Sequence, residues 1–160
     1  MKRKQYKQKT HYGMMDLLMA SPTEPLPTVK QIYQLDNFRE GLNNLERSPN
    51  PTPDDWRKVA DPINMLESLI DMGCIDDIEG LLKDATKAMG EAGARSLKTG
   101  VLRLSGLGMQ ACRAVIDDYA ACMAQLPERT MVQAYINTEK RIQAMRAGKS
   151  RANDVEVVSL

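Results

Sequence analysis

Apolar residues recur at steps of three and four along residues 28–47, and the positions between them are polar. Such spacing places the apolar side chains on one face of an α-helix, so the pattern predicts a helix over 28–47. That face comprises Val29, Ile32, Leu35, Phe38, Leu42 and Leu45. Thr28 stands at the start of the helix, where its hydroxyl can accept a hydrogen bond from the first turn.

A second helix is predicted over residues 53–72, after a proline-rich turn. Thr52 can cap this helix, Pro53 suits its first position, and the two aspartates that follow favour the positive end of the helix dipole. Pro62 lies inside the helix, lacks a backbone N–H, and is expected to kink the helix or split it. The single tryptophan, Trp56, is expected to pack near that bend.

Further helices are predicted over 75–92, over 106–126 with Ser105 as a cap, and from Pro127 to Gly148. A short helix is possible at 13–20, where apolar residues again follow helical spacing. Residues 93–104 are less regular, and they suit a loop, a short strand or a continuation of the preceding helix. No internal repeat stands out.

These elements predict an all-α fold, a single-domain bundle of about five helices. The length of 160 residues suits one domain, and 42% hydrophobic residues are typical of a globular chain. With 4% aromatic residues and 11 methionines, the core must be mainly aliphatic, which suits packed helices. The expected division is a basic, proline-rich N-terminal tail at 1–27, a helical domain at 28–148 and a C-terminal tail at 149–160. That last tail closes on VEVV, which could form an extended segment.

The setting expected for this chain is the cytoplasm, without contact with a membrane. No stretch approaches the roughly 18 apolar residues of a membrane span, and the basic N-terminus lacks the apolar run of a signal peptide. Three cysteines form an odd and sparse set, which argues against a disulfide scaffold and for a reducing compartment.

Charge is distributed unevenly along the chain. Residues 54–91 hold ten acidic against four basic side chains. An acidic surface of this kind can steer association with a basic surface on another protein, although acids are also ordinary on helix exteriors. The candidate protein-binding residues are Asp76, Asp77, Glu79 and Asp84.

Both ends of the chain are basic, and they suggest binding of DNA or RNA as an alternative. Tyr6 and Tyr12 could stack on bases beside a phosphate-binding surface, although short basic tails often serve only solubility. The candidate residues are Lys2, Arg3, Lys4, Lys7, Lys9, Lys140, Arg141 and Arg146. Residues 66–85 have the spacing of a helix-turn-helix, but their acidic second helix would be repelled by phosphate.

Residue types that carry catalysis do not converge in the sequence, so neither an enzyme nor a metal or cofactor site is expected. The only histidine, His11, lies in the basic segment. The cysteines lack metal-ligand spacing. Adjacent acids such as Asp117 and Asp118 point about 100° apart on a helix, so a solvated face is the favoured interpretation. The segment SGLGMQ at 105–110 matches neither phosphate-binding glycine motif and is better explained as a helix cap.

Three segments resemble stretches in small, uncharacterised proteins carried by phages, prophages and plasmids of proteobacteria. They are TPDDWRKVADPINMLESLIDMG, RLSGLGMQACRAVIDDYA, and LPERTMVQAYINTEKRIQAM together with DVEVVSL. The resemblance covers roughly residues 25–160 and brings no catalytic motif. It implies a mobile-element setting.

The sequence therefore predicts a non-enzymatic binding protein of a phage or other mobile element. It would dock on a host or phage macromolecule in the host cytoplasm, in a regulatory or anti-defence role. A host or phage protein is the expected partner, and a homo-oligomer is possible. The alternative is an accessory protein that binds DNA or RNA through its basic ends.

Overall fold

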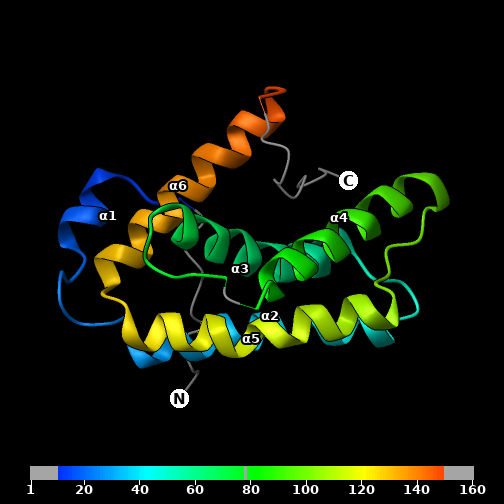
Figure 1. Ribbon diagram of the computed structural model, residues 1–160, viewed down its shortest axis with the longest axis horizontal. Helices are drawn as coiled ribbons and strands as arrows, with labels where there is room; N and C mark the ends of the chain where they lie inside the picture. The colour runs from blue at the N-terminus through cyan, green and yellow to red at the C-terminus, as the bar shows by residue number, and fades with distance from the viewer. Residues whose placement is uncertain (1–10, 78, 150–160) are drawn as a thin grey trace, which may run out of the picture.

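The computed structural model describes residues 11–77 and 79–149, which form six α-helices and no β-strand (Figure 1). The all-α prediction is confirmed. The helices are α1 (Met14–Met19), α2 (Thr28–Arg47), α3 (Pro53–Asp71), α4 (Leu81–Thr99), α5 (Gly106–Gln125) and α6 (Glu128–Arg146). The helix count exceeds the expected five because the short segment at 14–19 is also helical.

The start of α3 follows the predicted capping chemistry. The Thr52 hydroxyl accepts a hydrogen bond from the Asp55 N–H at 3.3 Å, and Asp55 accepts one from the Thr52 N–H at 2.8 Å. Asn44 of α2 donates to the same carboxylate at 2.8 Å. Burial by itself would raise the pKa of Asp55, but the hydrogen bonds from Thr52 and Asn44 outweigh it and lower that pKa. The cap therefore also joins α3 to α2.

Helix α3 is the centre of the fold. It contacts α2, α4, α5 and α6, and it carries more buried residues than any other described helix. It runs unbroken through the buried Pro62, so of the two outcomes expected at this proline, a kink or a split, the split does not occur. Trp56 is 2% exposed and belongs to the core, in agreement with its predicted role.

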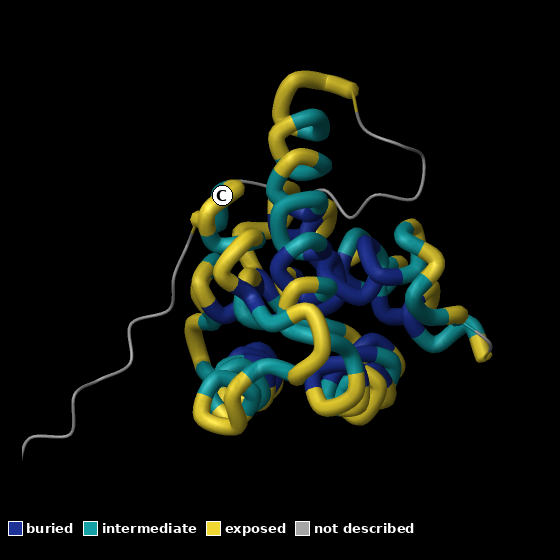
Figure 2. The backbone as a smooth tube through the Cα atoms, turned by 90° about the vertical axis from the view of Figure 1, so that its left-hand side faces the viewer, coloured by how far each residue is buried: buried dark blue, intermediate teal, exposed yellow. Residues whose placement is uncertain are grey.

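The helices pack in two layers around this core. In Figure 1, α2 and α5 lie side by side along the lower edge, and α3 and α4 lie above them. Helix α6 packs against α3 as far as Arg141, and its C-terminal end extends beyond the body. Figure 2 shows the buried backbone gathered between the layers, with exposed backbone outside. None of the helices in the described ranges combines the length and the apolar character that crossing a membrane requires.

Helix α4 differs from its predicted bounds of 75–92. The described residues of 74–80 form a connection, and the helix begins at Leu81 after Gly80, which has a left-handed φ of 69°. Asp77 lies in the connection, yet its carboxylate accepts from the N–H groups of Leu82 and Lys83 at 3.1 Å each. Asp77 therefore caps α4 from outside the helix.

The ambiguous residues 93–104 are resolved as the end of α4, followed by an irregular connection. This connection is tied to the C-terminus of α2 by Arg103, which donates to the carbonyl oxygens of Ser48 at 2.6 Å and Glu46 at 3.3 Å. Carbonyls at a helix end lack partners within the helix, so Arg103 satisfies groups that α2 leaves open. Ser105 then caps α5 as predicted, accepting from the Gly108 N–H at 3.0 Å.

Residues 11–27, expected to belong to a tail, lie against α6. The Glu128 N–H donates to the Glu24 carbonyl at 2.8 Å, and the Arg129 N–H donates to the Ser21 carbonyl at 2.9 Å. These bonds satisfy N–H groups that the start of α6 leaves open. The basic part of the predicted tail, residues 1–10, lies outside the described residues, as does the VEVV segment at the C-terminus.

The apolar face predicted for α2 is buried only in its second half. Phe38, Leu42 and Leu45 belong to the core, whereas Val29 and Ile32 are 63% and 54% exposed. Helical spacing therefore identified the face of α2 correctly but not the length over which it is covered.

Candidate functional site

An open groove of about 440 Å³ lies between the C-terminal half of α3, the connection 74–80, the start of α4 and the second half of α5. We call it the acidic groove. It is lined by Leu66, Ile70, Cys74, Ile75, Asp76, Asp77, Glu79, Leu81, Leu82, Asp118, Ala121, Cys122, Gln125 and Leu126.

The deep part of the acidic groove is apolar. Leu66, Leu82 and Cys122 are buried beneath it, and Ile70 and Leu126 are half-buried beside them. These five side chains come from α3, α4, α5 and the residue after α5, so the packing of the helices creates the groove. An apolar surface of this shape favours binding of apolar side chains, which leave water on entering it.

The edge of the acidic groove carries four carboxylates, which we call the rim carboxylates: Asp76, Asp77, Glu79 and Asp118. Asp76, Glu79 and Asp118 are exposed. Within residues 11–77 and 79–149, no ion pair joins any rim carboxylate to a basic side chain. The pKa of Asp118 is raised, first by burial and then by the negative charges of Glu79, Asp117 and Asp77. Among the described residues, the groove therefore concentrates negative charge.

The structure brings together three of the four predicted protein-binding residues, Asp76, Asp77 and Glu79. Asp84 is exposed on α4 and does not line the acidic groove. Asp118 joins the rim because α5 packs beside α4, a proximity that the one-dimensional sequence does not contain. From the sequence, Asp118 was noted only because it follows another acid, Asp117.

Cys122 contributes a buried thiol to the groove. Burial raises the pKa of Cys122 to about 11, with smaller contributions from Asp118 and Cys74, so this thiol stays protonated at neutral pH. A protonated thiol is a weak nucleophile and a poor metal ligand. No group of three or more metal-ligating side chains suited to an ion occurs in the described part of the chain.

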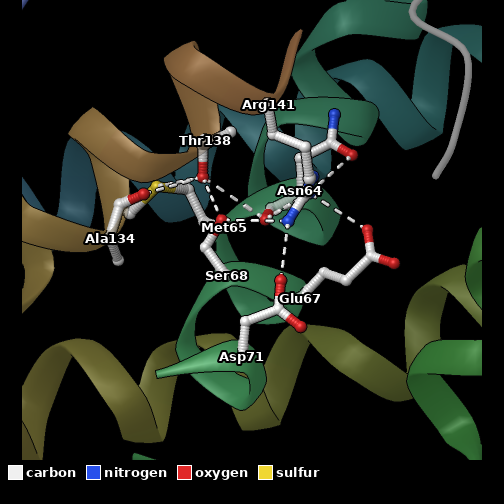
Figure 3. A network of polar contacts seen from close by, with 8 residues as sticks. All are labelled: Asn64, Met65, Glu67, Ser68, Asp71, Ala134, Thr138 and Arg141. Carbon is white, nitrogen blue, oxygen red and sulfur yellow. Dashed lines mark hydrogen bonds and ion pairs between the residues drawn. The ribbon is translucent and has the colours of Figure 1, made fainter. Parts of the chain in front are cut away.

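A second group of polar side chains lies on the other face of α3, where α6 packs (Figure 3). We call it the polar network: Asn64, Glu67, Ser68, Asp71, Thr138 and Arg141. The Arg141 guanidinium donates to Glu67 at 3.0 Å, to the Asn64 carbonyl at 3.0 Å and to the Ser68 hydroxyl at 3.1 Å. Asp71 lies 3.6 Å from it. The Arg141 side chain is only 9% exposed.

Hydroxyl groups continue the polar network into the core. The Ser68 and Thr138 hydroxyl oxygens lie 2.7 Å apart, and Thr138 donates to the Ala134 carbonyl at 2.8 Å. Since a hydroxyl has a single hydrogen, Ser68 donates to Thr138 while it accepts from Arg141. Sequence reasoning missed this network. Its signal was a polar stripe at positions 64, 67, 68 and 71, which resembles the solvent face of an amphipathic helix.

The candidate nucleic-acid residues do not form one described surface. Arg141 is directed into the fold, while Lys140 and Arg146 are exposed on α6. The candidates between residues 2 and 9 lie outside the described residues. Tyr12 contacts Tyr135, with ring centroids 4.5 Å apart.

His11 is 79% exposed and pairs with Glu139 across 3.2 Å, between Nδ1 and Oε2. A histidine this exposed, with one surface carboxylate beside it, lacks the held geometry of a catalytic base. In the comparisons with known proteins, no family model, no curated protein and no solved structure matches this chain.

Proposed function

We propose that this protein is a non-enzymatic binding protein that docks on a partner protein through the acidic groove. The observation that carries the proposal is the combination of an apolar depression with four rim carboxylates that lack basic partners among the described residues. Like charges held together cost free energy in the unbound protein, and a positively charged partner relieves that cost.

The wider setting belongs to the same proposal. Resemblance of residues 52–73, 103–120, 126–145 and 154–160 to mobile-element proteins supports a phage or plasmid origin, with action on a host or phage protein in the cytoplasm. A regulatory or anti-defence role fits a protein whose chemistry is binding alone. The residues of the groove support the docking step, and the resemblance supports only the setting.

Binding of DNA or RNA remains the alternative proposal, and it now rests on fewer residues. Arg141 is occupied by α3, so Lys140 and Arg146 are the candidates that the described surface presents. The acidic groove itself would repel phosphate.

The test is an affinity purification from the native host with three tagged proteins and nuclease treatment. One is the wild type. In Ala121→Trp, an exposed alanine in the groove wall becomes bulky and obstructs the groove. In Ala124→Trp, an exposed alanine on the same helix but outside the groove lining serves as the matched control.

We expect a nuclease-resistant partner that wild type and Ala124→Trp retain and Ala121→Trp loses. Equal recovery with all three proteins would overturn the proposal that the groove is the docking site. Loss of every partner on nuclease treatment would favour the nucleic-acid alternative instead. Circular dichroism of each variant shows whether a lost partner reflects lost folding.

A further inference from the structure

The chemistry of the acidic groove also defines what fits in it. We infer that its occupant is a basic amphipathic helix of the partner protein, with an apolar stripe bordered on both sides by lysine or arginine. This inference rests on the proposed function, because it describes the ligand of the same groove.

Apolar contact is the first requirement. The buried Leu66, Leu82 and Cys122 and the half-buried Ile70 and Leu126 offer no charge to a ligand. A volume of about 440 Å³ accommodates a few large side chains and not a folded surface. The occupant therefore inserts apolar side chains from a single segment.

The placement of the rim carboxylates favours a helical segment. Asp76, Asp77 and Glu79 lie on the connection before α4, whereas Asp118 lies on α5, so negative charge comes from two different walls. An amphipathic helix presents an apolar stripe with polar residues along both edges, which matches this arrangement. A β-strand places its polar residues on the face opposite its apolar ones, and they would point away from the groove.

Not all rim carboxylates are equally suited to a test. Asp77 also accepts the N–H groups of Leu82 and Lys83, so its replacement would disturb the start of α4. Asp76 and Glu79 are exposed. The double variant Asp76→Lys/Glu79→Lys is therefore the test protein. Asp84→Lys/Glu91→Lys, which makes the same change of charge on exposed positions of α4 outside the groove, is its matched control.

The probes are three synthetic peptides of about four helical turns. The first carries leucines at helical spacing with lysines on either side. The second replaces the lysines by glutamate, and the third replaces the leucines by serine. Binding to the full chain is measured by fluorescence anisotropy, and NMR shift changes locate the bound peptide.

We expect the leucine–lysine peptide to bind at the acidic groove about tenfold or more tightly than either other peptide. The test variant should weaken that binding about tenfold or more, and the control variant should leave it within about twofold. Equal binding of the first and third peptides, or equal loss in both charge variants, would overturn the inference.

Sedimentation of the wild type and the test variant examines another occupant, a second copy of this chain. Self-association abolished by Asp76→Lys/Glu79→Lys would assign the groove to a second copy and overturn a separate partner. A monomeric wild type supports the inference.

The proposed function fails on a separate observation, when Ala121→Trp loses no partner. A partner that Ala121→Trp loses but Asp76→Lys/Glu79→Lys retains would leave the docking function in place and reject only a basic ligand.

Discussion

The two faces of the C-terminal half of α3 differ in how the charges beside them are arranged. One face bears Asn64, Ser68 and their neighbours, which meet Arg141 of α6 in hydrogen bonds and ion pairs. The other bears Leu66 and Ile70, which underlie the acidic groove, where carboxylates gather without a basic partner among the described residues. The same helix therefore borders a region where opposite charges meet and a region where like charges accumulate.

Because of this difference, we expect the polar network to contribute to stability and the acidic groove to the proposed binding. A buried charge that loses its partner strongly destabilises a protein, so the polar network should support the fold. Carboxylates exposed at a rim contribute little to stability, and reversing them should be tolerated. Variants of the two regions should therefore separate cleanly in denaturation and in binding experiments.

The largest expected effect is that of Arg141→Met on stability. Methionine fills part of the space but donates no hydrogen bond, so Glu67, Ser68 and the Asn64 carbonyl lose a donor within a buried region. We expect the free energy of unfolding in urea to fall by about 2–4 kcal/mol.

Lys140→Met is the control for Arg141→Met, because Lys140 is the exposed neighbour on the same helix. It should change the free energy of unfolding by less than about 0.5 kcal/mol. Peptide binding at the groove should survive Arg141→Met at temperatures where the variant is folded. Equal stability of the two variants would show that the polar network does not hold α6 on α3.

Thr138→Val should have the next largest effect. Valine keeps the shape of threonine but leaves the Ser68 hydroxyl without its acceptor and removes the donor to the Ala134 carbonyl. The expected loss is about 1–2 kcal/mol of unfolding free energy. Thr138→Ser keeps the hydroxyl and should cost less than Thr138→Val. The opposite order would mean that packing of the methyl group outweighs the hydrogen bonds.

Helical spacing predicted most of the fold because it records which side of each helix meets the core. The caps at Thr52 and Ser105 followed from local chemistry, since a cap involves residues only three positions apart. The cap predicted at Thr28 is wrong, because Pro27 occupies the cap position of α2 and no side chain caps this helix. The prediction of where α4 begins was wrong for a related reason. Asp77 has the capping chemistry of a helix start, but it acts from a loop, and nothing local in the sequence distinguishes the two arrangements.

The candidate functional regions were predicted only where they lie within one segment. Asp76, Asp77 and Glu79 are neighbours in sequence, so their charge could be seen as a group. Asp118 lies far away along the chain and enters the groove only through the packing of α5. Arg141 appeared as a basic surface residue, because the side chains that surround it are supplied by α3.

For the groove, the prediction is that charge reversal leaves the fold intact. Asp76→Lys/Glu79→Lys removes repulsion at the rim and places lysines beside Asp77 and Asp118. We expect the free energy of unfolding to stay constant or rise by up to about 0.5 kcal/mol, measured by urea denaturation. A loss as large as that of Arg141→Met would show that these acids support the fold, and the contrast between the two regions would fail.

The smallest effect concerns Asp118 and pH. Burial and the charges of Glu79, Asp117 and Asp77 raise the pKa of Asp118 in the folded protein, and the Cys122 thiol interacts with the same carboxylate. The folded state therefore binds a proton more readily than the unfolded state, so stability rises as pH falls through the raised pKa.

At neutral pH, Asp118→Asn should be more stable than the wild type by no more than about 0.5 kcal/mol, because solvent screens this exposed group. That advantage should disappear below the usual carboxyl pKa of about 4 and shrink in high salt. Asp117 lies beside Arg113 in a separate pocket, so Asp117→Asn relieves the repulsion of Asp118 but also gives up a nearby positive charge, and it should gain less than Asp118→Asn. An equal gain in both variants, or a gain independent of pH, would mean that removing any acid from α5 is favourable and that the groove does not concentrate negative charge.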